Sequence, residues 1–425
     1  MDFPYSGLDE CVRITKNALK ITKNLFYKYI NNKTHELYSF GSVARREMGP
    51  YSDLDLLIIS KKPNLNQIKK YRLALAKALP NHRLDLLEKY KPKELIRIGS
   101  IDGTDRQALL FLRNESCNKK NSKLLQEATS QIRLDEMGNF REIFHIMANI
   151  DNIYPSLFGL NNIKFSPGGI KDFYFAYLIT RFMDEKNEVY NISSAIKYLK
   201  KYNLIDNKKS IDLLKILNKL LFLRNRIQEF HKSEVNIINN KTKNYLSKTL
   251  CIEKKEFNEL IKSYQLDIKM FYLELKKIVL SMVKSRLDAQ IYYLVEELLS
   301  NKRNLNSKII NEIFNCKYEI PMMLLAYYTT NIKTLKKLRK INPNNWYILY
   351  GIANNKYVNE KILFSLMIPR ENEKRIVKNL YNNFSWRNIY LYIAKNPSAT
   401  NRIKQYIINY PKARKIDIEA ALNNC

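Results

Sequence analysis

Apolar and polar positions alternate in two different ways along the N-terminal part of the chain. Apolar residues recur at steps of three and four over residues 8–31 and 64–79, which predicts two amphipathic helices. Short apolar runs predict three strands, with a short helix after the first; the strands are 35–40, 54–59 and 83–87, and the helix is 42–48. This alternation up to about residue 125 predicts a small domain with a mixed sheet.

After about residue 126 the strand patterns fade, and helical spacing fills residues 140–285. The pattern is interrupted at 164-KFSPGGIKD-172, where Pro167 and two glycines predict a turn from which the next helix begins. We therefore expect a helical domain over residues 126–285.

The C-terminal part repeats itself. The segments 346-WYILYGIANNKYVNEKIL-363 and 386-WRNIYLYIAKNPSATNRIK-404 share an Ile-Ala-x-Asn core at a spacing of 41, and Leu325-Ala326 resembles a looser copy. A period near 40 with helical spacing predicts paired helices stacked as a short solenoid over residues 286–425. Its aromatic residues fit core packing better than base stacking; they are Trp346, Tyr347, Tyr350, Trp386, Tyr390 and Tyr392. The whole pattern predicts an α+β fold in three parts.

Charge and cysteine content narrow the class of protein. The 73 Lys and Arg residues against 41 Asp and Glu give a net charge of +32, which fits either a polyanionic partner such as RNA or a solvated basic surface. The five cysteines are scattered singly, so neither disulfides nor a zinc site is expected. No run of 18 apolar residues and no signal-peptide layout is present, so we expect a cytoplasmic protein without a membrane partner.

The candidate chemistry lies at 40-FGSVARREMGPYSDLDLLIIS-60. Side chains alternate along a strand, so Asp53 and Asp55 share one face, and their mutual repulsion is costly unless cations lie between them. Carboxylate oxygens suit Mg²⁺ or Mn²⁺, and a third carboxylate would complete a two-metal site. Asp85, in the middle of the third strand, is the best candidate for this third ligand. Asp102 and Asp105, in a turn-like IDGTD segment, are weaker ones.

Gly41 and Ser42 precede these aspartates at a short interval. A glycine lets the backbone approach a triphosphate closely, and the serine hydroxyl can bind its oxygens. A phosphate cradle followed by a pair of metal ligands suits in-line attack on the α-phosphate of an NTP, with pyrophosphate as the leaving group.

This strip resembles the DNA polymerase β-type nucleotidyltransferase superfamily and, more narrowly, the bacterial PII-uridylyltransferase family. The residues in that register are Gly41, Arg45, Glu47, Pro50, Tyr51, Ser52, Asp53 and Asp55. The resemblance implies a nucleotidyltransferase domain over residues 1–125 with Asp53, Asp55 and Asp85 as catalytic metal ligands. It also implies that the nucleotide is bound by Gly41, Ser42, Arg45, Ser52 and Lys171.

The resemblance continues into the helical part. The segment 162-NIKFSPGGIKD-172 is similar to an Asn-x-Lys…Gly-Gly-Leu-Arg-Asp segment of the same family, which implies that Lys164, Lys171 and Asp172 border the cleft. The family's hydrolase and glutamine-sensing domains are not expected here, because no His-Asp cluster follows His231. Where the family has further glycines, this loop has Ser42, Ala44 and Arg46, which leaves the choice of nucleotide open.

Several functions remain open from the residues. The first is transfer of an NMP group from ATP or UTP to a protein, with the repeats binding that target; the second is an RNA nucleotidyltransferase acting on tRNA 3′ ends. A third is a HEPN-like ribonuclease, because 221-LFLRNRIQEFH-231 places Arg224 and His231 on one helix. A non-catalytic binding module is the last, and the oligomeric state is not predicted.

Overall fold

A computed structural model describes most of the chain, and it confirms the α+β fold class. The described residues are 6–30, 34–60, 64–90, 111–116, 136–153, 155, 161–184, 188–300, 305–316, 318–341, 345–367, 385–410, 418 and 421–422. Asp102 and Asp105 lie outside them. The chain divides into two compact units: unit 1 is 1–143 with 160–275, and unit 2 is 144–159 with 276–425. The sequence-based boundaries at residues 125 and 285 stay predictions.

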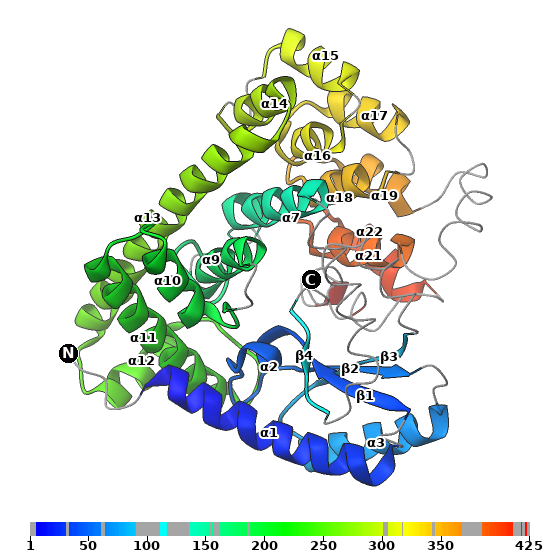
Figure 1. The fold of residues 1–425 in the computed structure, drawn as a ribbon. Helices are drawn as coiled ribbons and strands as arrows, with labels where there is room; N and C mark the ends of the chain where they lie inside the picture. Colours follow the sequence, from blue (N-terminus) through cyan, green and yellow to red (C-terminus); the bar gives the residue numbers. More distant parts are fainter. Residues whose placement is uncertain are drawn as a thin grey trace. The chain divides into compact units, whose positions relative to one another are not determined.

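Unit 1 contains a mixed four-stranded sheet in the order β3-β2-β1-β4 (Figure 1). β1 (His35–Ser39) pairs antiparallel with β2 (Leu54–Ser60) and with the short β4 (Arg113–Asn114), while β2 and β3 (Leu84–Tyr90) run parallel. β1, β2 and β3 confirm the three strands predicted from apolar runs. β4 was not predicted, because two residues are too few to show a pattern. The helix predicted over 42–48 is shorter, α2 (Gly41–Arg45), because Arg46 adopts a left-handed conformation that ends it.

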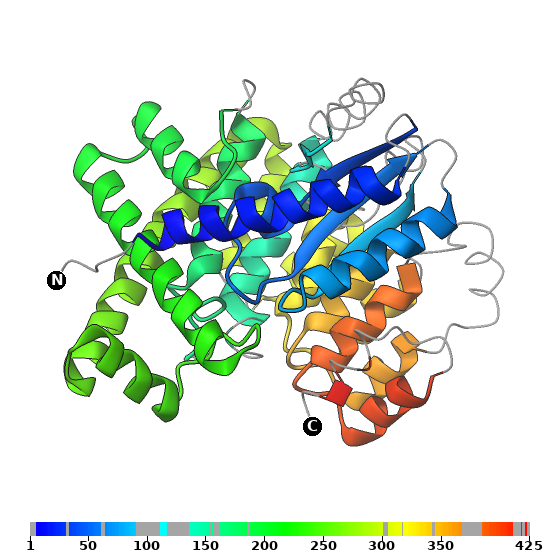
Figure 2. The same cartoon turned by 90° about the horizontal axis from the view of Figure 1, so that it is seen from below.

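One face of this sheet is covered by two helices, α1 (Gly7–Tyr29) and α3 (Leu65–Ala78), as seen from below in Figure 2. Ser6 and Asn64 cap their N-termini by accepting backbone N–H groups. Their apolar stripes and the inward strand residues form one core; its members include Phe26, Leu37, Leu56, Ile58, Ile68 and Tyr71. This core fixes the sheet, and thereby the edge on which the aspartates lie.

The remainder of unit 1 is helical. It comprises α9 (Ile170–Met183), α10 (Ile192–Lys201), α11 (Asn207–His231), α12 (Asn240–Leu250) and the first part of α13 (Lys254–Arg286). α1 packs closely on α11: a Cβ on Gly7 would lie 2.3 Å from the carbonyl oxygen of Asn218 and the backbone nitrogen of Phe222. The predicted turn before α9 is confirmed, and Gly168 in it has a φ of +79°. The sheet and these helices therefore form one folded unit.

Unit 2 is a stack of helix pairs and begins with parts of α7 (Glu136–Ala148) and α13, which both units share, and η1 (Asn149–Ile153). The first helices of the pairs pack side by side; they are α14 (Ala289–Ser300), α16 (Glu319–Tyr328), α18 (Trp346–Asn354) and α21 (Ser385–Lys395). The second helices are α15 (Ser307–Asn315), α17 (Ile332–Ile341), α19 (Glu360–Met367) and α22 (Asn401–Asn409). The predicted solenoid of paired helices is thus present.

The period predicted for it was wrong in part. The first helices begin at residues 289, 319, 346 and 385, so only the last step is close to 40. The recurring asparagines nevertheless have a shared role. Asn355 Nδ2 donates to the carbonyls of Ala326 and Thr329, and Asn396 Nδ2 donates to those of Ala353 and Asn355. Each asparagine thereby satisfies the C-terminal carbonyls of the preceding first helix.

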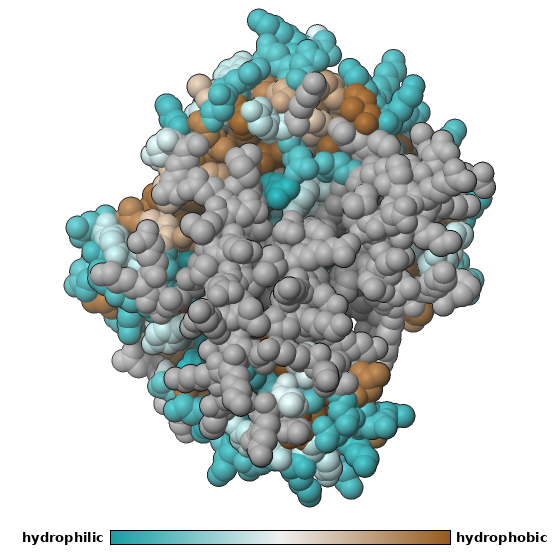
Figure 3. All heavy atoms as spheres, turned by 45° about the vertical axis from the view of Figure 1, so that its right-hand side comes forward, coloured by the Kyte–Doolittle hydropathy of each residue, from teal (hydrophilic) through white to brown (hydrophobic). Residues whose placement is uncertain are grey.

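The aromatic residues of the repeats behave as predicted where their side chains are described. Tyr350 and Tyr390 are buried, and the rings of Tyr350 and Tyr392 lie edge to face with centroids 4.1 Å apart. No helix among the described residues is long and apolar enough to span a bilayer. On the described part of the face in Figure 3, hydrophilic residues form most of the outermost surface, and apolar residues lie mainly between them.

Candidate active site

Two parallel strands bring the three predicted aspartates to one edge of the sheet. Asp53 directly precedes β2, Asp55 is its second residue, and Asp85 is the Cα partner of Asp55 in the β2–β3 register. In a parallel pair, residues in register present their side chains on the same face. The structure therefore places Asp53, Asp55 and Asp85 together, as the strand pattern predicted.

Gly41 lies in very close contact with the Asp55 side chain. The φ of Gly41 is +59°, and a Cβ built on it would lie only 2.0 Å from Oδ2 of Asp55. A side chain at this position would therefore be strained by its backbone and would displace the carboxylate. The two segments are also joined directly, because the Phe40 N–H donates to the Asp55 carbonyl over 3.2 Å. This close approach explains why glycine begins the motif.

The carboxylates are electrostatically unfavourable as they stand. Burial, followed by repulsion from Asp53 and Asp85, raises the pKa of Asp55 to about 8. Burial, followed by the negative charge of Glu234, raises the pKa of Asp53 to about 6, although Arg83 opposes the shift with an ion pair of 2.7 Å. Among the described residues, none forms a hydrogen bond with the Asp55 side chain. The cluster holds more negative charge than its surroundings compensate.

A divalent cation fits this donor set. Carboxylate oxygens are the ligands that Mg²⁺ and Mn²⁺ prefer, and positive charge between them would lower the raised pKa values. In the part of the chain that is described, however, no three His, Cys, Asp or Glu side chains converge closely enough to hold an ion as they stand. The Asp53 carboxylate is paired with Arg83 instead. For all three aspartates to bind a metal, Asp53 must give up this ion pair.

The loop between α2 and β2 is fixed from within. Glu47 is buried; it accepts hydrogen bonds from Arg45 Nε and from the Ile192 N–H at the start of α10, each 2.8 Å long. The Arg45 guanidinium also lies over the rings of Tyr174 and Tyr177. Arg45 thus links the loop to α9 while its charge lowers the pKa of Asp55.

Other candidate residues of the loop are held similarly. The Ser52 hydroxyl accepts the Gly49 N–H over 2.8 Å, and its carbonyl lies 2.9 Å from Nδ1 of His82. Arg46 donates hydrogen bonds to the Val43 carbonyl and to the buried Glu115. This basic side chain is therefore neutralised within the fold. Nucleotide binding by Ser42, Arg45 and Ser52 stays a prediction.

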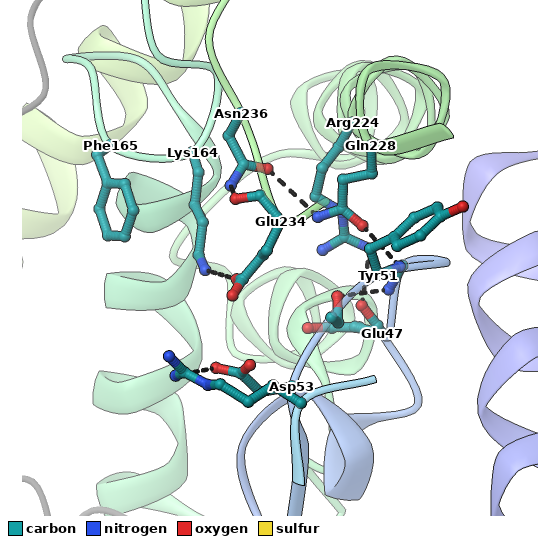
Figure 4. A network of polar contacts seen from close by, with 12 residues as sticks. Glu47, Tyr51, Asp53, Lys164, Phe165, Arg224, Gln228, Glu234 and Asn236 are labelled. Atoms are coloured by element: carbon teal, nitrogen blue, oxygen red, sulfur yellow. Dashed lines mark hydrogen bonds and ion pairs between the residues drawn. The ribbon is translucent and has the colours of Figure 1, made fainter. Parts of the chain in front are cut away.

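Helix α11 supports the same loop from the helical part of unit 1 (Figure 4). Arg224 is buried and donates to the Glu47 carbonyl over 2.8 Å, and Gln228 Oε1 accepts the Tyr51 N–H over 3.3 Å. These side chains come from about 175 residues further along the chain than the loop. The position of Asp53 consequently depends on α11 as well as on the sheet.

The same contacts assign a structural role to the ribonuclease-like pair. Arg224 also contacts the sulfur of Cys11, and His231 pairs with the hydroxyl of Thr242 over 3.0 Å. The arginine is thus used to join α11 to the loop and α1, and the histidine to join α11 to α12. This use favours packing over phosphodiester cleavage for the RNRIQEFH segment.

Two lysines predicted at the cleft lie near the aspartates. The charge of Lys164 lowers the pKa of Asp55, and the negative charge of Asp55 in turn raises the pKa of Lys171, so both amines lie near this carboxylate. Lys171, in the first turn of α9, lies over the rings of Tyr174 and Phe165, with its nitrogen 4.5 Å from the Tyr174 centroid. Burial, then the charges of Lys164 and Arg45, lowers the pKa of Lys171 to about 7. Asp172, in contrast, is buried and accepts the Gly168 N–H, so it holds the turn.

Arg83 and Glu234 are site residues that the sequence did not reveal. Arg83 directly precedes β3 and pairs with Asp53, while Glu234 pairs with Lys164 over 2.8 Å (Figure 4). Arg83 could have been noticed, since it lies two residues before Asp85. Glu234 follows a helix end in a polar segment with no motif, so only the tertiary structure brings it to Asp53.

Comparison with known proteins agrees with this geometry. Residues 17–103 match the family model described as a nucleotidyltransferase domain, and this range includes all three aspartates and the Gly41 loop. No curated protein matches the chain. The match spans about a fifth of the sequence, so it characterises the N-terminal part. The N-terminal part of this chain is therefore similar to nucleotidyltransferase domains of the DNA polymerase β type, which as a class transfer NMP groups.

Proposed function

We propose that this protein is a metal-dependent enzyme that moves an NMP group from an NTP to a protein side chain and releases pyrophosphate. The observation that carries the proposal is the placement of Asp53, Asp55 and Asp85 at the same end of two adjacent parallel strands, with Gly41 against Asp55. Their shared excess of negative charge suits a site that works with bound cations.

Asp53, Asp55 and Asp85 would hold Mg²⁺ or Mn²⁺. Such ions polarise the α-phosphate and neutralise charge on the leaving pyrophosphate. The protein's own contribution is placement: Gly41 lets the chain approach the phosphates, and Ser42 offers a hydroxyl. Lys171 supplies a cation from α9 that forms no ion pair with another described residue. Charge stabilisation of this kind accounts for most catalysis in phosphoryl transfer.

A protein acceptor is favoured by the likeness of the loop to PII-uridylyltransferases and by the solenoid, since stacked helix pairs offer extended binding surfaces. The second candidate acceptor is RNA, favoured by the net charge of +32. The two make different predictions about where a labelled nucleotide is found after reaction.

The test is incubation of the protein with each α-³²P-labelled NTP, Mg²⁺ or Mn²⁺, and a bacterial lysate. We expect label in protein bands that resist ribonuclease and disappear with protease. Label that ribonuclease removes would establish an RNA acceptor. If no macromolecule is labelled with any of the NTPs, the result contradicts the transferase assignment.

The matched variants are Asp53→Asn and Asp55→Asn, which keep the shape of each side chain and remove its charge. We expect both to lose transfer by at least about a thousandfold, because one metal ligand is lost, while far-UV circular dichroism stays unchanged. Asp9→Asn, in the first turn of α1, serves as a control for loss of a carboxylate outside the site. Full activity in the Asp53→Asn, Asp55→Asn double variant would refute the metal-site assignment.

A further inference from the structure

Glu234 and Lys164 form an ion pair that is built into the wall of the site. Their segments are joined by a β-bridge between Asn162 and Ile237, and the Ile163 N–H donates to the Asn236 carbonyl over 2.9 Å. Asn236 also accepts a hydrogen bond from Gln228 on α11. Because both backbones are fixed, the 2.8 Å pair between the Lys164 amine and the Glu234 carboxylate follows from the fold.

The pair lies in the field of the catalytic aspartates. Glu234 is the largest charged contribution that raises the pKa of Asp53, and Lys164 lowers the pKa of both Asp53 and Asp55. Figure 4 shows the Glu234 carboxylate between Lys164 and Asp53. A carboxylate that faces a metal-binding aspartate adds repulsion, which is unfavourable unless it serves the lysine. Glu234 is thus an anion held by Lys164 beside the aspartate cluster.

The ion pair is weak enough for a phosphate group to displace Glu234 from Lys164. The Lys164 and Glu234 side chains are 29% and 32% exposed, and ion pairs that solvent reaches contribute little to stability. A polyphosphate carries several charges and arrives with a cation, so it can replace one carboxylate at Lys164. Lys171 differs, because its amine lies over Tyr174 and Phe165 and forms no ion pair with another described residue.

We propose that Glu234 is a positioning residue that competes with the ligand's phosphates for Lys164 and pairs with it again when pyrophosphate leaves. This inference rests on the proposed nucleotidyl transfer. The competition weakens the binding of NTP and of pyrophosphate alike, and thereby favours product release over retention. Lys164, which pairs with Glu234, acts as the exchangeable cation of the site, whereas Lys171 has no carboxylate partner to exchange among the described residues.

The test compares the wild type with Glu234→Gln in the full-length protein by isothermal titration calorimetry. The ligands are pyrophosphate and the non-hydrolysable α,β-imido forms of ATP, UTP, CTP and GTP, each with Mg²⁺. Removal of the competing charge should tighten binding of pyrophosphate and of the preferred NTP analogue by roughly two- to fivefold. In steady-state kinetics KM and kcat should fall together, since substrate and product are both held more tightly.

A double-mutant cycle with Lys164→Gln identifies the route of the effect. If Glu234 acts through Lys164, Glu234→Gln should give little gain in the Lys164→Gln background. An equal gain there would show plain repulsion between Glu234 and the ligand, and would overturn the proposal, as would unchanged affinity in Glu234→Gln alone. If the wild type itself binds none of these ligands, the proposed function fails rather than this inference.

The matched control is Glu188→Gln. Glu188 pairs with Lys201 over 2.7 Å. Lys201 is the last residue of α10, whereas the residue that contacts Glu47, Ile192, is the first. This substitution removes an exposed ion pair of the same kind without touching the site. It should leave the affinities unchanged, and a gain equal to that of Glu234→Gln would mean that the effect comes from net charge alone.

Discussion

Individual residues in this site are constrained by very short distances. The Gly41 α-carbon and the Asp55 carboxylate leave no room for a methyl group between them, and Gly41 has a conformation that other residues rarely adopt. Gly49, six residues before Asp55, lies in the same loop, but its φ is not in the left-handed region, and a Cβ there would approach the side chains of Gln228 and Asn225 rather than Asp55. The two glycines are therefore unequal.

We predict that Gly41→Ala costs about 1–2 kcal/mol of stability from the backbone alone and lowers transfer by about a hundredfold, because Asp55 is displaced. Gly49→Ala should have a clearly smaller effect on transfer. Urea unfolding and initial rates measure the two quantities. Equal rates for the wild type and Gly41→Ala would show that the Asp55 carboxylate need not occupy its present position.

A second prediction concerns Lys171, whose pKa is lowered to about 7 by burial and by the charges of Lys164 and Arg45. The amine is charged below this pH and loses its proton above it, so affinity for pyrophosphate should fall as pH rises from 6 to 8.5. Lys171→Arg keeps a charged group throughout this range. The arginine variant should therefore lose less affinity than the wild type over the same interval.

Both proteins share the titration of the ligand, so the difference between their pH profiles reports on Lys171. Binding is measured by calorimetry at a fixed Mg²⁺ concentration. Parallel profiles would mean that Lys171 remains charged across the range or lies away from the ligand.

Among the elements, the repeat helices illustrate how one side chain can join two helices. Asn396 is buried, and its amide satisfies the carbonyls of Ala353 and Asn355 at the end of α18. Asn354 is similarly buried, but its amide donates to the Tyr350 carbonyl of its own helix, α18. The pair allows a comparison between a contact across helices and a contact within one.

We predict that Asn396→Ala destabilises unit 2 by about 2–3 kcal/mol, because buried carbonyls lose their donor, and that Asn354→Ala costs about 1 kcal/mol or less. The chain's two tryptophans, Trp346 and Trp386, both belong to the repeats, so their fluorescence reports the unfolding of this unit in urea. A larger loss for Asn354→Ala than for Asn396→Ala would contradict the role given to the recurring asparagines.

For the whole molecule, the joining of the sheet and the helices in unit 1 has a consequence for truncation. α1 meets α11 at backbone distance, with the Leu8 N–H donating to the Asn218 side chain, and α11 supports the loop that carries Asp53. A fragment of residues 1–125 would expose the α11-facing side of α1 to water. We predict that it binds a hydrophobic dye and unfolds without a sharp transition.

A fragment of residues 1–275 keeps all of unit 1 and should unfold cooperatively in urea, as followed by far-UV circular dichroism. It should also bind pyrophosphate with the affinity of the full-length protein. A cooperatively folded 1–125 fragment would show instead that the sheet and its two covering helices suffice, and that α11 contributes only to the placement of the loop.

Local patterns in the sequence were enough to predict much of this protein. The 3.6-residue period predicted α1 and α3, since burial on one face of a helix requires such spacing, and short apolar runs predicted the three longer strands. The alternation at Asp53 and Asp55 predicted their common face, and the apolar flanks of Asp85 predicted its neighbouring strand. The Asn-containing repeat predicted paired helices, although the first helices of the described pairs do not begin at a constant interval.

Other features were decided only by tertiary contacts. β4, the two-residue strand, is held by pairing with β1 and has no period of its own. Arg224 suggested a ribonuclease motif in the sequence, but its burial against the Glu47 carbonyl favours a structural role. The ion pairs of Arg83 with Asp53 and of Glu234 with Lys164 join charges from segments that lie far apart in the sequence. Periodicity records which face of an element is buried, whereas an ion pair depends on which segments meet, and that is determined only when the chain has folded.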